Sequence, residues 1–167
     1  MIRSRTILWL LVATLILMIT INIQNKLLIS PSAPSGIISL ELSNTAPQVK
    51  EIAREWAGEK MIAFYINIAL DYFYLLFYGT FLYLACRYFA LRNISFRKTG
   101  IYASVAGLTA AGLDTIENGL MLIHINFSPS NFLAVMTSAI ATTKFILAAF
   151  AVLFLLYAAI SSLFPGR

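Results

Sequence analysis

Four charged side chains stand inside long apolar stretches of the chain, where membrane lipid would surround them. They are Asp71, Asp114, Glu117 and Lys144. A charge near the middle of a bilayer costs about 2.5–3.5 kcal/mol even on the most lenient insertion scale, and such residues are rarely found without a partner or a function. The pattern therefore indicates a buried polar site built from carboxylates and one lysine.

The chemistry open to such a site follows from its charge balance. Three acidic residues face one basic residue, so Lys144 can compensate only one carboxylate. At least one of the other carboxyl groups is expected to be protonated at neutral pH, because burial and neighbouring negative charge both disfavour its ionised form. Such a group can donate a proton, act as a proton-dependent switch or bind a cation. The alternative is structural: hydrogen bonds between these side chains only hold three helices together.

Two asparagines and two tyrosines extend the candidate site. Asn67, Asp71, Tyr74 and Tyr78 follow one another at helical spacing, so the four side chains share one face of a helix. Asn118 lies one helical turn after the second aspartate and joins the same inner side of the next stretch. We expect both polar faces to point toward the interior of a helical bundle.

The elements that must position these residues are four long apolar stretches. The chain of 167 residues is 60% hydrophobic and only 11% charged, whereas a soluble domain has roughly a quarter of its residues charged. Each stretch reaches about the 20 residues that span a bilayer. The sequence therefore predicts an all-α protein, a single integral membrane domain over residues 1–167 that forms a four-helix transmembrane bundle. The expected spans are about 6–23, 61–86, 100–125 and 132–163.

Residues 24–60 form the only long segment outside the expected spans. Its first part, 30–36, is rich in proline, serine and glycine and predicts turns. A helix start signal follows at residues 44–47, and apolar residues then recur at helical spacing up to Trp56. We expect a short extracytoplasmic amphipathic helix between spans one and two, with Trp56 at the membrane interface. The helix could rest on lipid headgroups or act as a lid.

The basic residues outside the spans predict the orientation. Seven of them occupy three segments that contain no Asp or Glu, whereas residues 24–60 carry four acidic and four basic residues. By the positive-inside rule, we expect both termini in the cytoplasm. We expect the protein in the plasma membrane, which in a bacterium is the inner membrane. Topology thus explains the net charge of +5, and we expect no binding to nucleic acid. The seven residues are Arg3, Arg5, Arg87, Arg92, Arg97, Lys98 and Arg167.

This orientation brings the charged residues to one level. Spans two and four then run inward and span three runs outward. At about 1.5 Å per residue, Asp71, Asp114, Glu117 and Lys144 lie about 10–18 Å from the outer boundary, within about 8 Å of one another in depth. Three helices therefore contribute to one candidate site near the midplane.

The remaining reactive residue types exclude several classes of protein. Cys86 is the only cysteine, which excludes a dithiol oxidoreductase. His124 is the only histidine, so a transition-metal site is not expected. The sequence contains no glycine-rich phosphate loop, and we expect no metal and no cofactor.

The order of these features resembles a widespread family of uncharacterised bacterial four-span membrane proteins. The resemblance covers about residues 35–145. It implies the same topology and the same site, adds Glu41 to the candidate residues, and implies no particular reaction. The matching pattern consists of residues 36–42 (Gly-Ile-Ile-Ser-Leu-Glu-Leu), Trp56, residues 71–73 (Asp-Tyr-Phe), Tyr78, residues 113–118 (Leu-Asp-Thr-Ile-Glu-Asn) and residues 144–145 (Lys-Phe).

The function that these observations favour is binding of a small amphiphilic or lipid-like ligand. The carboxylates and Lys144 would bind its polar end in a site open toward the outer leaflet, and Tyr74 and Tyr78 would line the approach. Two other functions stay open: an accessory subunit of a membrane complex with a purely structural polar core, and a small proton-coupled transporter. Whether the site catalyses a reaction is also open. The expected partners are membrane lipid and either another membrane protein or a second copy of the chain.

Overall fold

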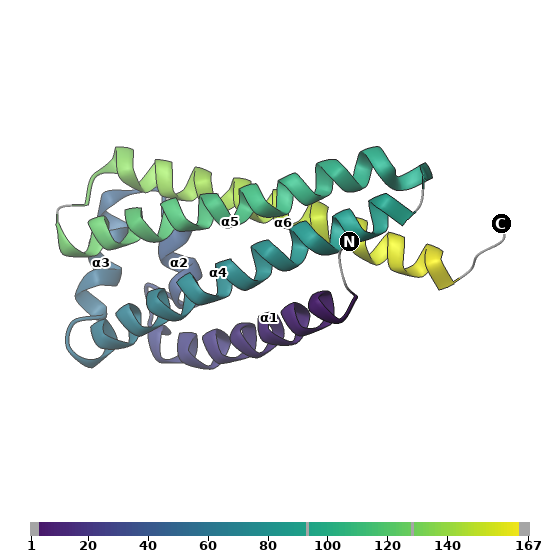
Figure 1. Ribbon diagram of the computed structural model, residues 1–167. Helices are drawn as coiled ribbons and strands as arrows, with labels where there is room; N and C mark the ends of the chain where they lie inside the picture. Colours follow the sequence, from purple (N-terminus) through teal and green to yellow (C-terminus); the bar gives the residue numbers. More distant parts are fainter. Residues whose placement is uncertain (1–3, 93, 128, 164–167) are drawn as a thin grey trace.

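The computed structural model describes residues 4–92, 94–127 and 129–163. Arg3 and Arg167, two of the basic residues that predict the orientation, lie outside the described residues. The regular elements of the described part are all helical (Figure 1). In chain order they are α1 (Ser4–Asn25), the short 3-10 turn η1 (Lys26–Leu28), α2 (Ile37–Glu41), α3 (Ala46–Glu55), α4 (Glu59–Arg92), the second 3-10 turn η2 (Ile94–Phe96), α5 (Arg97–Asn126) and α6 (Asn131–Leu163).

Three of the long helices are sufficiently long and apolar to cross a membrane. They are α1, α4 and α6, with candidate spans Ser4–Leu28, Glu59–Arg92 and Asn131–Ser162. The prediction of an all-helical protein with membrane-spanning helices is confirmed to this extent. α5 has 30 residues, similar to its neighbours, but it does not join them as a candidate span.

Close packing holds α5 against both α4 and α6. One face of α5 consists of small residues and is buried, since Ala103, Gly107 and Ala110 lie inside the bundle. A Cβ atom on Gly107 would lie 2.6 Å from the Cβ of Leu82 in α4, so only glycine permits this approach of the two helices. The approach brings the polar residues of α5 close to those of its neighbours.

One end of the bundle is covered by α2 and α3. Thr45 caps α3, its hydroxyl accepting a hydrogen bond from the Gln48 N–H, as the helix start signal predicts. The Ala46 N–H donates to the Oδ1 of Asn131 at the start of α6, at 2.8 Å. The predicted amphipathic helix is therefore present, and it packs on the bundle through Val49 and Ile52.

The predicted position of Trp56 at the membrane interface is wrong. Its side chain is fully buried in protein. The indole N–H donates to the carbonyl of Leu28 at 2.8 Å, and the ring packs on Phe64 with centroids 5.7 Å apart. A buried indole needs a partner for its N–H, and the turn after α1 supplies one. Trp56, at the end of α3, therefore stabilises the packing of α3 on the bundle.

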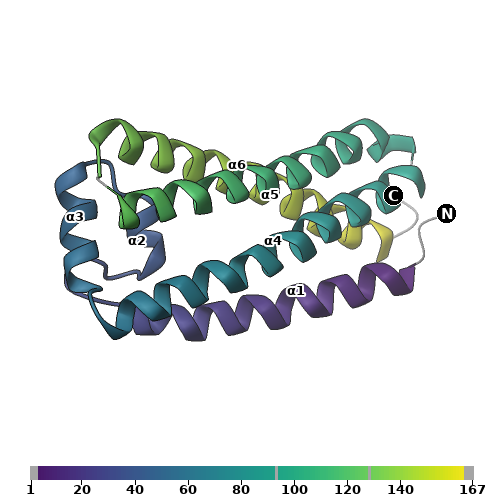
Figure 2. The same cartoon turned by 60° about the vertical axis from the view of Figure 1, so that its left-hand side comes forward.

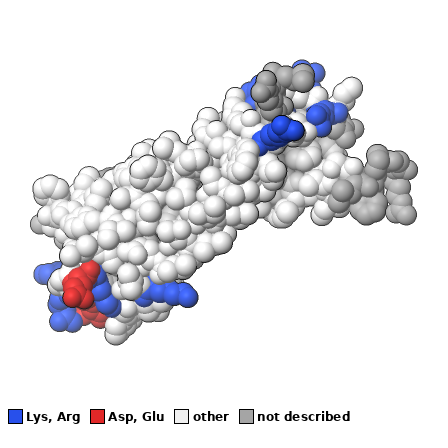
Figure 3. Space-filling view, turned by 60° about the horizontal axis from the view of Figure 1, so that its bottom comes forward, with Lys and Arg blue, Asp and Glu red and all other residues white. Residues whose placement is uncertain are grey.

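The long helices run side by side, and α1 begins at the same end of the bundle at which α6 ends (Figures 1 and 2). On the face seen in Figure 3, charged groups gather at the two ends and the surface between them has none. The end near the connection between α4 and α5 shows only basic groups, whereas the other end shows both signs. Large apolar side chains of α1 and α6, among them Trp9 and Leu153, are exposed.

Candidate functional site

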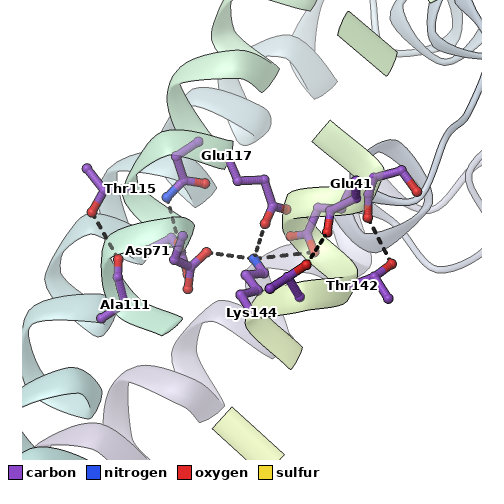
Figure 4. A network of polar contacts seen from close by, with 12 residues as sticks. Glu41, Asp71, Ala111, Thr115, Glu117, Thr142 and Lys144 are labelled. Carbon is purple, nitrogen blue, oxygen red and sulfur yellow. Dashed lines mark hydrogen bonds and ion pairs between the residues drawn. The ribbon is translucent and has the colours of Figure 1, made fainter. Parts of the chain in front are cut away.

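The centre of the site is Lys144, which three carboxyl groups surround. Its Nζ lies 2.6 Å from Oδ1 of Asp114, 2.8 Å from Oε2 of Glu117 and 3.6 Å from Oε2 of Glu41. Figure 4 shows Glu41 and Glu117 converging on the lysine ammonium group. Lys144 and all three acids are buried. Since a buried charge is tolerated when it is paired, this geometry explains how α6 carries a lysine halfway along its length.

A fourth acid, Asp71, lies beside this cluster with a different partner. The Nδ2 of Asn118 donates to Oδ2 of Asp71 at 2.7 Å. Asp71 is only partly buried, and among the described residues it has no ion pair with Lys144. The Tyr78 hydroxyl donates to Oδ2 of Asp114 at 3.0 Å and links α4 to the lysine cluster. The predicted convergence of Asp71, Asp114 and Lys144 is thus observed, although only Asp114 contacts the lysine.

Glu41 reaches the cluster because the chain turns inward after α1. The turn depends on Gly36, whose φ of +62° is a backbone conformation that other residues rarely adopt. A Cβ atom there would also collide with Asn25. The Asn25 side chain accepts from the Ile37 N–H at 2.7 Å and donates to the Ser35 carbonyl at 3.1 Å, which fixes the start of α2. Glu41 then ends this helix and points at Lys144.

The ionisation of Glu41 reflects this position. Burial raises the pKa of the Glu41 carboxyl above its ordinary value, Lys144 acts in the opposite direction, and the charge of Asp114 adds to the increase. The net direction is upward. Glu41 therefore holds a proton more readily in the folded protein than in an unfolded chain.

A cavity of about 790 Å³ opens beside the cluster. Glu41, Asp71, Asp114 and Lys144 line it together with Asn67, Asn118, Tyr74 and Tyr78. The rest of the lining is mainly apolar and comes from α1, α2, α4 and α6, as far as Phe89 and Ala159. The volume falls within the range of about 300–1,000 Å³ that is common for small-molecule sites.

Comparisons of the chain with protein-family models, with curated proteins and with solved structures return no match. The family resemblance therefore stays a prediction, and the geometry of the site is the only guide to its chemistry.

Most residues predicted for the site meet in one place. Eight of the ten border the cavity, and Glu117 lies directly behind it against Lys144. Trp56 does not belong to this group, because it is buried in the packing of α3 at the covered end. The eight are Glu41, Asn67, Asp71, Tyr74, Tyr78, Asp114, Asn118 and Lys144.

The contribution of α1 to the cavity was not predicted from the sequence. Its side chains form one wall of the cavity along most of its length. Three polar residues on this wall could have indicated the inner face of α1, because Thr14, Asn22 and Asn25 recur at helical spacing within a mainly aliphatic stretch. Thr14 is also the buried residue of α1. An almost uniformly apolar helix gives too weak a periodic pattern to reveal its inner face.

Proposed function

We propose that this protein is a membrane-embedded binding protein for a small amphiphilic molecule. The observation that carries the proposal is the composition of the cavity, which has a carboxylate and lysine cluster at one end and an apolar lining beyond it. A polar group of the ligand would lie near Asp71 and the lysine cluster. Its hydrocarbon part would lie between α1, α4 and α6. On α6 the lining extends from Lys144 to Ala159, an axial length of about 22 Å.

We further propose that α5 also crosses the membrane, which makes four spans. Its 30 residues correspond to about 45 Å, more than the roughly 30 Å of a hydrocarbon core. The polar residues that lower its hydropathy, Asp114, Glu117 and Asn118, are all buried against other helices. Lipid would therefore meet mainly the apolar side of α5. In this arrangement the site lies near the midplane of the plasma membrane and both termini are cytoplasmic.

A purely structural polar core is the competing function. The short contacts of Lys144 with Asp114 and Glu117 favour it, because such pairs can fix how helices assemble. It does not account for the cavity, which helix assembly does not require. It does account for the hydrogen bond from Asn118 to Asp71, which joins α5 to α4, but it does not require Asp71 to line a cavity.

The proposal is tested by identifying small molecules that co-purify with the protein. Mass spectrometry of extracts from the wild type should find an amphiphile enriched over the bulk lipid. Ala148→Trp places a large ring in the apolar part of the cavity, which Ala148 lines, and should abolish that enrichment. Ala139→Trp is the matched control, since Ala139 lies on the exposed side of the same helix and does not line the cavity.

The same variants separate a binding site from a scaffold. If Ala148→Trp folds with wild-type thermal stability and loses the enriched molecule, the cavity binds that molecule. Equal enrichment in the wild type and both variants would contradict the proposal.

A further inference from the structure

The charges around the cavity restrict the polar end of the ligand. Three acids and one base line it, and Glu117 adds a fourth acid behind. The ammonium group of Lys144 has two carboxylates within 2.8 Å and a third at 3.6 Å. Its positive charge is therefore already compensated, and an anionic group such as a phosphate would meet net negative charge.

Asp71 is the acid placed to meet a ligand. In the described part of the chain the only hydrogen bond to its carboxylate comes from Asn118, and that bond occupies one of the two oxygens. Asp71 is partly exposed and lines the cavity. The rings of Tyr74 and Tyr78, with centroids 4.9 Å apart, line the same region. Carboxylates and aromatic rings together favour a cation.

Asn67 provides a second, independent observation. Its side chain is 1% exposed and lines the cavity, and its Nδ2 has no hydrogen-bond partner within the described residues. A buried amide donor without a partner is unfavourable. Asn67 lies one helical turn from Asp71, so their side chains are neighbours on α4. The amide donor requires an oxygen acceptor close to the group that Asp71 binds.

We propose, building on the function proposed above, that the ligand is a long-chain amine with an adjacent hydroxyl or carbonyl oxygen. Its ammonium group binds Asp71 beside the rings of Tyr74 and Tyr78, and its oxygen accepts from Asn67. The hydrocarbon chain lies along α1, α4 and α6. A long-chain amino alcohol has this combination of groups.

The test compares four probes with saturated hydrocarbon chains of similar length and different polar ends: sphinganine, hexadecylamine, hexadecanol and hexadecyl phosphate. At pH 7 both amines are protonated, as a lysine side chain is. Binding to the full-length protein in detergent is measured by native mass spectrometry. Sphinganine should bind most tightly, with hexadecylamine next, and both at least tenfold more tightly than hexadecanol and hexadecyl phosphate.

Two variants assign the two contacts. Asp71→Asn should remove the preference for the amines over hexadecanol. Asn67→Ala should remove the advantage of sphinganine over hexadecylamine and leave stability unchanged or higher, because an unpartnered donor is lost. Glu59→Gln is the control for Asp71→Asn: it changes an exposed acid at the start of α4 and should leave all four affinities unaltered.

The possible failures are distinguishable. Tighter binding of hexadecanol or hexadecyl phosphate than of the amines would overturn this inference while the amphiphile site stands. Unchanged probe preferences in Asp71→Asn would also overturn it. Failure of all four probes to bind would contradict the proposed function as well.

Discussion

At the scale of single residues, the site is defined by what Lys144 contacts. A lysine in an apolar helix is unfavourable by itself, and its pairing with Asp114 and Glu117 makes it tolerable. The pairing is mutual, because each buried carboxylate would lose its main partner if the lysine were absent. Lys144 is therefore the residue whose removal should disturb the folded protein most.

We expect Lys144→Met to lower the free energy of unfolding by about 3–5 kcal/mol, because it leaves buried carboxylates without a compensating charge. Denaturant titration in mixed micelles measures this. The control is Lys50→Met, which replaces an exposed lysine of α3 and should have little effect. Adding Asp114→Asn to Lys144→Met should recover part of the loss. A loss no larger than that of Lys50→Met would contradict the importance of the pair.

Glu41 should make stability depend on pH. Its folded-state pKa lies above the ordinary value of 4.5, so at higher pH the unfolded chain releases a proton that the folded protein retains. The contribution is complete below about pH 4.5 and is lost as the pH rises through the folded-state pKa. Glu41→Gln should flatten this decrease in melting temperature, whereas Glu59→Gln should not. Parallel curves for Glu41→Gln and the wild type would contradict the assignment.

At the scale of elements, the short helix α2 decides whether Glu41 belongs to the site. It is held by the turn at Gly36 and by both ends of the Asn25 amide. The long helices need no such turn to fix their position, because small residues already determine which of their faces pack together. A substitution in this turn should therefore act on the site from outside the cavity.

We expect Gly36→Ala to destabilise the protein by about 1–3 kcal/mol, since the backbone conformation is unfavourable for alanine and its methyl group would meet Asn25. Gly119→Ala is the control: Gly119 has free space around it within α5, and alanine favours helix there by up to about 1 kcal/mol. Thermal unfolding distinguishes the two. Equal melting temperatures for both variants would show that α2 is not fixed by this turn.

At the scale of the whole molecule, charge is segregated along the bundle axis (Figure 3). The end at which α4 meets α5 carries Arg87, Arg92, Arg97 and Lys98 without an acid in that connection. Acidic residues gather in α3 and at the start of α4, at the opposite end. By the positive-inside rule, such an asymmetry of charge sets the orientation of a membrane protein.

We expect residues 24–60 to lie outside the cytoplasm. A cysteine introduced at Asn44 should react with an impermeant thiol reagent added to intact cells, and one introduced at position 95 should react only after the membrane is broken. Cys86 is buried and should give little background, and the wild type serves as the control. Labelling of position 95 in intact cells with protection of position 44 would reverse the proposed orientation.

The sequence by itself determined the long helices and most of the polar residues that meet around the cavity. Apolar length predicted α1, α4 and α6, because a membrane imposes a minimum span. The cost of a charge within an apolar helix singled out Asp71, Asp114, Glu117 and Lys144. Helical spacing then added Asn67, Tyr74 and Tyr78 from a single face of α4. These residues could be singled out because each inference depends on local pattern alone.

The tertiary structure decided the remaining features. Glu41 meets Lys144 across a separation of about a hundred residues, and α2 turns inward only because Gly36 and Asn25 fit each other. Trp56 is buried because the carbonyl of Leu28 lies within reach of its indole. The wall formed by α1 could not be located from a nearly uniform apolar stretch. Each of these depends on how distant segments pack, and no local periodicity encodes such contacts.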